Sequence, residues 1–359
     1  MRINITMSNV HVISTERNTY VDIIRGIAML LVILGHTMTG CTQGAENSFL
    51  YNVIWSLQMP LFFLVSGYVT RYSRKVENAD DLRKFVKRRT ISYLFPWLIW
   101  TFFVRGLIFM NSNFLNIKYL VFHMDAGYWF LTTIWFICII WGISNYFAEK
   151  FFKILFINKN LLIFIIYCIG IGILIVIGYI WGMSFLGIRL TLYYMPFYFV
   201  GYIYGQFQDR IQSSKRTLEF TEIIIAVCFI FWQSVLVRYN LYNLKDSIFN
   251  IVLRAMASIT GCIAITGLLK NVFNKQNYLC IKKIMWGVQE IGYHSIEIYV
   301  THYLFLSILH VDQTLKVTSI RGASLWIINY AITIILTTII VQILNMNKIL
   351  RFVLYGKCV

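Results

Sequence analysis

Residues 22–36, DIIRGIAMLLVILGH, combine a nearly continuous apolar run with three ionisable side chains, Asp22, Arg25 and His36. An apolar run is typical of a membrane-spanning helix, which needs about 20 residues to cross a hydrocarbon core of about 30 Å. The whole chain shares this character, because 58% of its 359 residues are hydrophobic and 13% are charged. Soluble proteins average about 25% charged residues. The composition therefore excludes a water-soluble protein and predicts an integral membrane protein.

Further apolar runs of similar length follow along the chain, and together they predict an all-α membrane domain of about ten transmembrane helices. This domain covers residues 22–345, between an N-terminal tail of residues 1–21 and a C-terminal tail of residues 346–359. The sixth and ninth runs are the most polar. The predicted spans are residues 22–40, 49–70, 90–110, 128–147, 161–181, 186–206, 221–237, 247–269, 286–309 and 323–345, and the longest connection is 71–89.

The basic residues are distributed unevenly between the two sides of this predicted bundle. The chain holds 32 Lys and Arg against 15 Asp and Glu, a formal net charge of +17. With the N-terminus inside, 23 of the 32 lie in inner segments, 5 in outer loops and 4 within spans. Cytoplasmic loops carry an excess of Lys and Arg, so we predict cytoplasmic termini in a multi-pass protein of the cell (plasma or inner) membrane. Topology explains most of the charge, and we expect contact with membrane lipids but no nucleic-acid partner.

Ionisable residues within a span are expensive and therefore indicate function. Arg25 and His36 are eleven residues apart, which places them on one face of a helix about 16 Å from each other. The arginine alone is also compatible with snorkelling to the cytoplasmic headgroups. His36 lies too far from that surface for this explanation.

The second and third spans add polar groups near the predicted depth of Arg25. The second runs inward and carries Ser66 and Gly67, where glycine allows close helix approach and serine is more often a packing hydrogen-bonder than a nucleophile. A basic block stands before the third span, and it suits either a cytoplasmic anchor with anionic lipid contacts or a phosphate-binding rim. The block consists of Arg83, Lys84, Lys87, Arg88 and Arg89.

The ninth span holds the densest group of titratable residues. Glu290, His294 and Glu297 share one helical face, while Tyr299 and His302 occupy a neighbouring strip. His302 falls at about the predicted depth of His36, which suits either a structural hydrogen bond or a polar cavity shared by the two histidines. The 7 Cys are scattered without a C-x-x-C pair, so we predict apolar packing and neither disulfides nor a metal site.

In this order, the motifs resemble those of the membrane-bound acyltransferase family 3, and the resemblance covers essentially the whole chain. Its most specific part is the combination of Arg25-x10-His36 with Phe-Phe-x-x-Ser-Gly in a ten-span chain. The motifs are Arg25-x10-His36, Pro60-Leu-Phe-Phe-Leu-Val-Ser66-Gly67-Tyr68, the basic run leading to Pro96, Trp129-Phe130-Leu131 and Tyr299-x-x-His302.

The resemblance implies an enzyme that moves an acyl group, usually acetyl, from cytoplasmic acyl-CoA to a hydroxyl of a cell-surface polysaccharide or its lipid-linked precursor. It implies that His36 is the catalytic base, and we expect His302 beside it. The donor, acetyl-CoA or another acyl-CoA, is expected to bind at Arg25, Ser66, Lys87, Arg88 and Arg89. The chain departs from many members at two positions, with Ser92 in place of a second arginine and Gly127 in place of a histidine.

The bare residues also allow a different class of protein. A polytopic transporter or flippase uses buried charges as well, and Glu290, His294 and Glu297 could form its proton relay. Against this class, the spans show no evident inverted repeat and no paired Gly- or Pro-broken helices. A sensor or scaffold without catalysis is a third possibility that the histidine pair disfavours.

Overall fold

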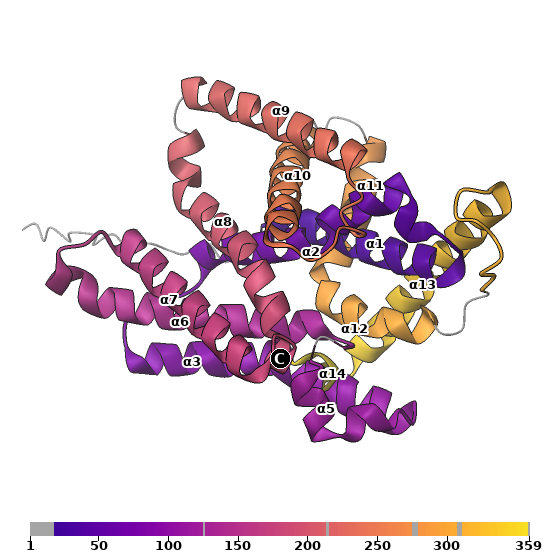
Figure 1. Cartoon of the computed structure of the whole chain (residues 1–359), viewed down its shortest axis with the longest axis horizontal. Helices are drawn as coiled ribbons and strands as arrows, with labels where there is room; N and C mark the ends of the chain where they lie inside the picture. Colours follow the sequence, from indigo (N-terminus) through magenta and orange to yellow (C-terminus); the bar gives the residue numbers. More distant parts are fainter. Residues whose placement is uncertain (1–17, 125, 213–214, 275–278, 307–310, 358–359) are drawn as a thin grey trace, which may run out of the picture.

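The computed structural model describes residues 18–124, 126–212, 215–274, 279–306 and 311–357 (Figure 1). Over these ranges the regular elements are helices, and the one extended pairing is an isolated bridge between Gln43 and Lys316. Most of the predicted N-terminal tail, residues 1–17, lies outside them. The long helices are α1 (Thr19–Cys41), α2 (Phe49–Tyr68), α6 (Trp129–Leu155), α7 (Lys159–Trp181), α8 (Ile188–Gln212), α9 (Lys215–Arg238), α10 (Ile248–Asn274) and α13 (Ile320–Met346).

Within the described ranges, eight helical stretches are long and apolar enough to cross a membrane. The chain is therefore an all-α, multi-pass membrane protein, as predicted. The eight correspond to all the predicted spans except the two most polar ones. The stretches are Thr19–Cys41, Phe49–Tyr72, Ala79–Ile108, Trp129–Leu155, Lys159–Trp181, Leu218–Arg238, Ile248–Lys270 and Ile320–Met346.

The sixth and ninth predicted spans are helical, but neither belongs to the eight stretches that are long and apolar enough to cross a membrane. The sixth is α8, whose middle is buried among its neighbours, at Met195, Phe197 and Tyr198 for example. The ninth was predicted as one helix over 286–309, and this was wrong: α11 (Leu279–Tyr293) and α12 (Ser295–Leu306) are separated at His294. Residues 307–309 of that span lie outside the described part of the chain.

The third span begins earlier than predicted. Helical structure runs from Ala79 to Ile108, so the predicted connection 71–89 contains helix α3 (Ala79–Arg89). The Asn78 side chain caps this helix by accepting the Asp81 N–H at 2.9 Å. Helix α4 (Phe95–Leu98) then lies between two π-helical segments, η3 (Thr90–Leu94) and η4 (Ile99–Ile108). The basic block therefore lies on an ordered helix rather than in a loop.

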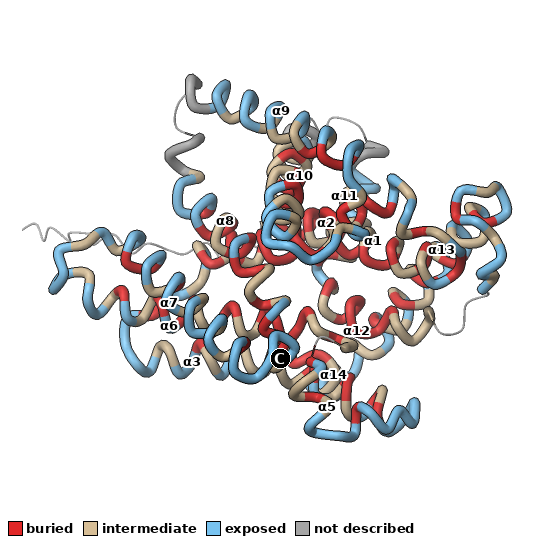
Figure 2. The backbone as a smooth tube through the Cα atoms, in the orientation of Figure 1, coloured by how far each residue is buried: buried red, intermediate tan, exposed pale blue. Residues whose placement is uncertain are grey.

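Helices α1 and α2 form the centre of the bundle, and Figure 2 shows their backbones largely buried, whereas α9 is exposed along much of its length. Glycines bring their neighbours close. A Cβ on Gly67 would lie 1.8 Å from the carbonyl oxygen of Tyr198, and one on Gly292 would lie 1.7 Å from that of Asp22. The close helix approach expected at Gly67 is thus confirmed, against α8.

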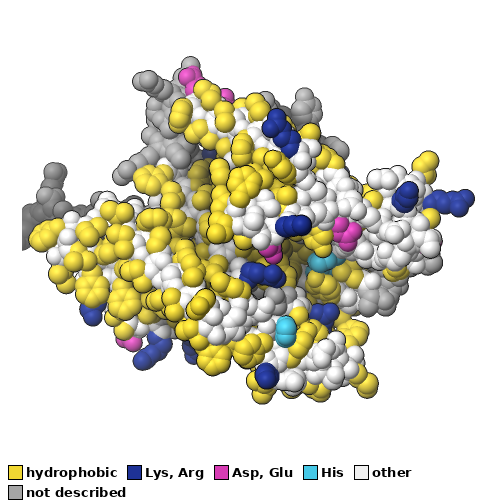
Figure 3. All heavy atoms as spheres, viewed as in Figure 1, with side chains coloured by type: hydrophobic (Ala, Val, Ile, Leu, Met, Phe, Trp, Pro, Cys, Tyr) yellow, Lys and Arg dark blue, Asp and Glu magenta, His cyan; other side chains and the backbone are white. Residues whose placement is uncertain are grey.

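Apolar side chains dominate the exposed surface, as lipid contact requires. Figure 3 shows hydrophobic side chains over most of the visible face, with basic, acidic and histidine side chains gathered around a hollow near its middle. The exposed apolar residues of α7 and α9 include Ile173, Val176, Phe220 and Ile230. An exterior of this kind would be insoluble in water but suits hydrocarbon.

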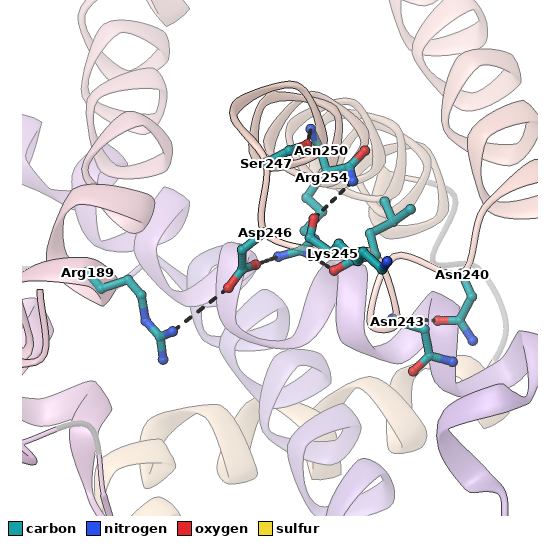
Figure 4. Close-up of polar contacts among 9 residues, drawn as sticks. Arg189, Asn240, Asn243, Lys245, Asp246, Ser247, Asn250 and Arg254 are labelled. Atoms are coloured by element: carbon teal, nitrogen blue, oxygen red, sulfur yellow. Dashed lines mark hydrogen bonds and ion pairs between the residues drawn. The ribbon is translucent and has the colours of Figure 1, made fainter.

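Two of the four basic residues predicted within spans, Arg189 and Arg254, are paired with one carboxylate. Asp246 precedes α10, and Figure 4 shows it between Arg189 and Arg254. Its Oδ1 lies 2.9 Å from Nη1 of Arg254, and its Oδ2 lies 4.0 Å from Nη1 of Arg189. These arginines are therefore paired at a helix entrance rather than isolated in hydrocarbon.

The predicted C-terminal tail contains a further helix, α14 (Lys348–Tyr355), which packs against the third span. Trp100 Nε1 donates to the carbonyl oxygen of Leu354 at 2.8 Å, and the Tyr355 hydroxyl lies 3.2 Å from Thr301 Oγ1. Burial raises the pKa of Tyr355 to about 12, so this hydroxyl stays protonated at neutral pH. The shorter helices elsewhere are η1 (Ala45–Asn47), η2 (Val69–Tyr72), η5 (Ser112–Leu115), α5 (Ile117–Phe122) and η6 (Phe185–Gly187).

Candidate active site

An inner cavity of about 260 Å³ lies between α1, α2, the third span and the α11–α12 junction. Arg25, Ser66 and Arg89 all line it. They come from three different helices, so the structure brings together three of the five residues predicted for donor binding. The Nη1 of Arg25 lies 3.8 Å from Oδ1 of the buried Asp22. Ser66 lines the cavity, while its neighbour Gly67, about 100° further round α2, packs against α8.

A second cavity of about 570 Å³ adjoins the first, and the two share Ser92, Tyr293 and Lys357 in their linings. We call it the outer cavity and the first the inner cavity; these names do not refer to the sides of the membrane. The lining of the outer cavity includes five basic side chains and no acidic one among the described residues. They are Lys84, Lys87, Arg88, Arg351 and Lys357. Since like charges repel, such a set is suited to an anionic ligand.

The predicted cluster of Lys87, Arg88 and Arg89 is thus divided between the two cavities. Successive residues of a helix project about 100° apart, so Arg89 faces the inner cavity while Lys87 and Arg88 stay exposed at the outer one. The Arg89 guanidinium stacks 5.1 Å from the centre of the Phe85 ring, and its Nη1 is 3.5 Å from the Tyr93 hydroxyl. Its buried Nε makes no hydrogen bond to the described residues.

The two predicted catalytic histidines lie side by side. The ring centres of His36 on α1 and His302 on α12 are 5.5 Å apart. His302 is fully buried, and its Nδ1 donates to the carbonyl oxygen of Ile298 at 3.1 Å. Its Nε2 is buried without a hydrogen-bond partner among the described residues. A lone pair left unpaired in a membrane interior costs free energy.

Aromatic side chains separate the inner cavity from this histidine pair. Phe62, Phe130 and Tyr299 line the cavity, and the Phe130 ring centre lies 5.4 Å from that of Phe62 and 5.3 Å from that of Tyr299. The Tyr299 ring centre is in turn 6.0 Å from that of His302. The Tyr299 hydroxyl also accepts the Phe130 N–H at 3.4 Å, which satisfies a free donor in the first turn of α6. Neither histidine lines the described cavities, so this aromatic layer stands between the cations and the histidines.

Sequence reasoning missed two residues beside the histidines. The Tyr303 hydroxyl lies 3.1 Å from Nε2 of His36. The Arg105 guanidinium lies 5.6 Å from the centre of the Tyr303 ring, a cation–π contact. The position of Tyr303 next to His302 was the available signal, but adjacent helix residues project about 100° apart, so adjacency alone could not show that both reach α1.

The two carboxylates of the ninth predicted span, Glu290 and Glu297, differ in burial. Glu297 is fully buried, receives a hydrogen bond from His294 Nδ1 at 3.1 Å and is ion-paired with Lys357. The Glu290 side chain is exposed. Of the three residues predicted on one helical face, His294 and Glu297 contact each other. Lys357 and Arg351 were predicted merely as residues of a tail, since no local pattern indicates a return to the bundle.

Taken together, these features define a multi-pass helical membrane protein with a cation-lined double cavity and a buried histidine pair. The family model described as an acyltransferase domain, acyltransferase 3, matches residues 18–346, and the chain belongs to this family. This membership favours the enzyme over the transporter or flippase considered from the bare residues.

A curated protein is similar to part of the chain. The chain is 24% identical over 241 residues to the nodulation protein NolL of Sinorhizobium fredii (strain NBRC 101917 / NGR234). The match covers 63% of this chain and 61% of NolL. No solved structure matches this chain.

Proposed function

We propose that this membrane acyltransferase transfers an acyl group, usually acetyl, from cytoplasmic acyl-CoA to a hydroxyl of a cell-surface polysaccharide or its lipid-linked precursor. The observation that carries the proposal is the succession of a cation-lined double cavity, an aromatic layer and a histidine pair. In this proposal the protein lies in the plasma or inner membrane with both termini cytoplasmic, so that the cavities open to the compartment that holds the donor.

The donor site consists of the two cavities. Coenzyme A carries several phosphate charges at one end and the thioester at the other, and the five cations of the outer cavity suit the phosphates. Arg25, Ser66 and Arg89 then line the path of the pantetheine arm. The unpaired Nε of Arg89 and that of Arg351 support this assignment, because each offers a buried N–H donor without a partner among the described residues.

The acyl transfer is a general-base reaction at the histidine pair. An imidazole nitrogen of the pair accepts the proton of the acceptor hydroxyl, and the hydroxyl oxygen bonds to the thioester carbonyl carbon. The carbon–sulfur bond then breaks, and the departing thiolate takes the proton from the imidazolium. The products are an ester and free coenzyme A, and no further reactant is consumed. The thioester reaches the histidines when the layer of Phe62, Phe130 and Tyr299 parts.

The test measures the surface glycan of cells with and without the protein by mass spectrometry. A gain of about 42 Da per modified sugar, the mass of an added acetyl group, is the expected result. Cells that carry His36→Ala at normal membrane level should show no gain. An unmodified glycan in the presence of the wild-type protein, together with no acyl-CoA consumption by the purified protein, would refute the proposed function.

A further inference from the structure

The last described residues of the chain are held firmly against the bundle. The Asn347 side chain accepts the Ile349 N–H at 2.9 Å and so caps α14. At the other end of the helix, Leu354 accepts a hydrogen bond from Trp100, and the Tyr355 hydroxyl contacts Thr301. A Cβ on Gly356 would lie 1.9 Å from the carbonyl oxygen of Ile91. Residues 347–357, here called the C-terminal strap, therefore have a defined place beside η3.

Lys357 at the end of this strap lies where the two cavities meet, since it lines both. Its ammonium is ion-paired with Oε1 of the buried Glu297 and lies 5.1 Å from the centre of the Tyr293 ring. A lysine ammonium has three N–H donors, so a carboxylate on one side leaves donors for a ligand on the other. Glu297 is itself held by His294, which fixes the position of the ammonium.

Arg351 is a second cation that the strap contributes to the outer cavity. It lines the same cavity as the cations that α3 contributes. Its Nε is buried and makes no hydrogen bond to the described residues. The strap and α3 thus present cations to one cavity from two sides. This arrangement is unfavourable unless a charged ligand lies between them.

We propose that Arg351 and Lys357 bind phosphate groups of the acyl donor, which makes the C-terminal strap a wall of the donor site. Glu297 is a positioning residue that holds the Lys357 ammonium at the junction of the cavities. The proposal rests on the proposed function, because it takes acyl-CoA as the source of the phosphates. A phosphate of a lipid headgroup offers the same chemistry, and the experiment separates the two.

The test measures binding of coenzyme A and of pantetheine, which lacks phosphate, to the full chain in phosphatidylcholine nanodiscs by isothermal titration calorimetry. Lys357→Gln and Arg351→Gln should each weaken coenzyme A binding about tenfold, the expected loss of one charge-assisted contact. Pantetheine binding should not change. Lys348→Gln is the matched control, because Lys348 lies on the same helix as Arg351, is exposed and lines neither cavity.

Glu297→Gln tests the positioning role. It should weaken coenzyme A binding as Lys357→Gln does, and the double variant should bind no worse than either single one, since both act on one contact. Lys357→Arg keeps the charge, so its affinity for coenzyme A should lie within about threefold of the wild-type affinity. This result would show that the loss in Lys357→Gln comes from the missing charge and not from misfolding.

The possible outcomes are distinct. Wild-type affinity in both glutamine variants would overturn the role of the strap, and so would an equal loss of pantetheine binding, which would indicate a structural effect. Unchanged coenzyme A affinity in the glutamine variants together with lost phosphatidylglycerol binding would assign these cations to a lipid. No coenzyme A binding by the wild type would instead refute the proposed function.

Discussion

The hydroxyl of Tyr303 lies 3.1 Å from Nε2 of His36, so a residue of α12 engages the histidine of α1. The neighbouring His302 keeps its own Nε2 unpaired, while its Nδ1 is fixed by the Ile298 carbonyl. The two histidines therefore have different surroundings: one is oriented by a phenol, and the other presents a free, buried nitrogen. This difference leads to separate expectations for the three side chains.

Tyr303→Phe removes the hydroxyl that orients His36 and leaves the ring in place. We expect kcat to fall about tenfold, the kinetic equivalent of one ordinary hydrogen bond. KM for the acyl donor should not change, because Tyr303 lines neither described cavity. Initial rates with purified protein and labelled acetyl-CoA measure both constants, and an unchanged kcat would contradict the orienting role.

His36→Ala and His302→Ala should each lower the transfer rate by about 10² to 10⁴, the usual contribution of a general base. The double variant should lose little more than the stronger single one, because residues that act as a unit are not additive. The control is His123→Ala, since His123 is exposed and lies outside the pair. Full activity of either single variant would exclude that histidine from the chemistry.

Arg25→Gln should weaken acyl-CoA binding about tenfold, since a charge-assisted contact to the donor is lost. Arg321→Gln is the control, because Arg321 is exposed and lines neither described cavity. Equilibrium dialysis with labelled coenzyme A measures the affinity of both variants. Equal coenzyme A affinities in the two variants would contradict donor binding by Arg25 and would favour snorkelling of its side chain to the headgroups.

Gly292→Ala should destabilise the fold, because its Cβ would lie 1.7 Å from the carbonyl oxygen of Asp22 and force α1 and α11 apart. The expected cost is about 1 to 3 kcal/mol, as for overpacking elsewhere. Gly287→Ala is the matched control on the same helix, since nothing lies within 4 Å of its Cβ. That change should be neutral or stabilising by about 0.5 to 1 kcal/mol. Thermal unfolding in detergent compares the two, and equal midpoints would contradict the packing.

The orientation of the bundle can be tested with two fusions at Val359. The excess of basic residues in alternate connections predicts a cytoplasmic C-terminus. A green fluorescent protein fused there should therefore fluoresce, and an alkaline phosphatase fused there should be inactive. The opposite pair of results would invert the topology and place the outer cavity away from cytoplasmic acyl-CoA.

The sequence by itself determined the membrane class, the approximate positions of the helices and the motifs that indicate an acyltransferase. These features are local: apolar length decides whether a segment can span the bilayer, and periodicity places Arg25 and His36 on one face. The same reasoning indicated that His302 lies at the depth of His36. It could not recognise the helical start of the third span at Ala79 or the break at His294, because polar residues there dilute the apolar signal.

Only the tertiary structure decided how these helices meet. It split the basic block between two cavities, placed an aromatic layer before the histidines, and returned Arg351 and Lys357 from the end of the chain to the cavities. The physical reason is that each feature depends on side chains from helices far apart in sequence. A buried carboxylate such as Glu297 needs a cation, but nothing local specifies that Lys357, sixty residues later, supplies it.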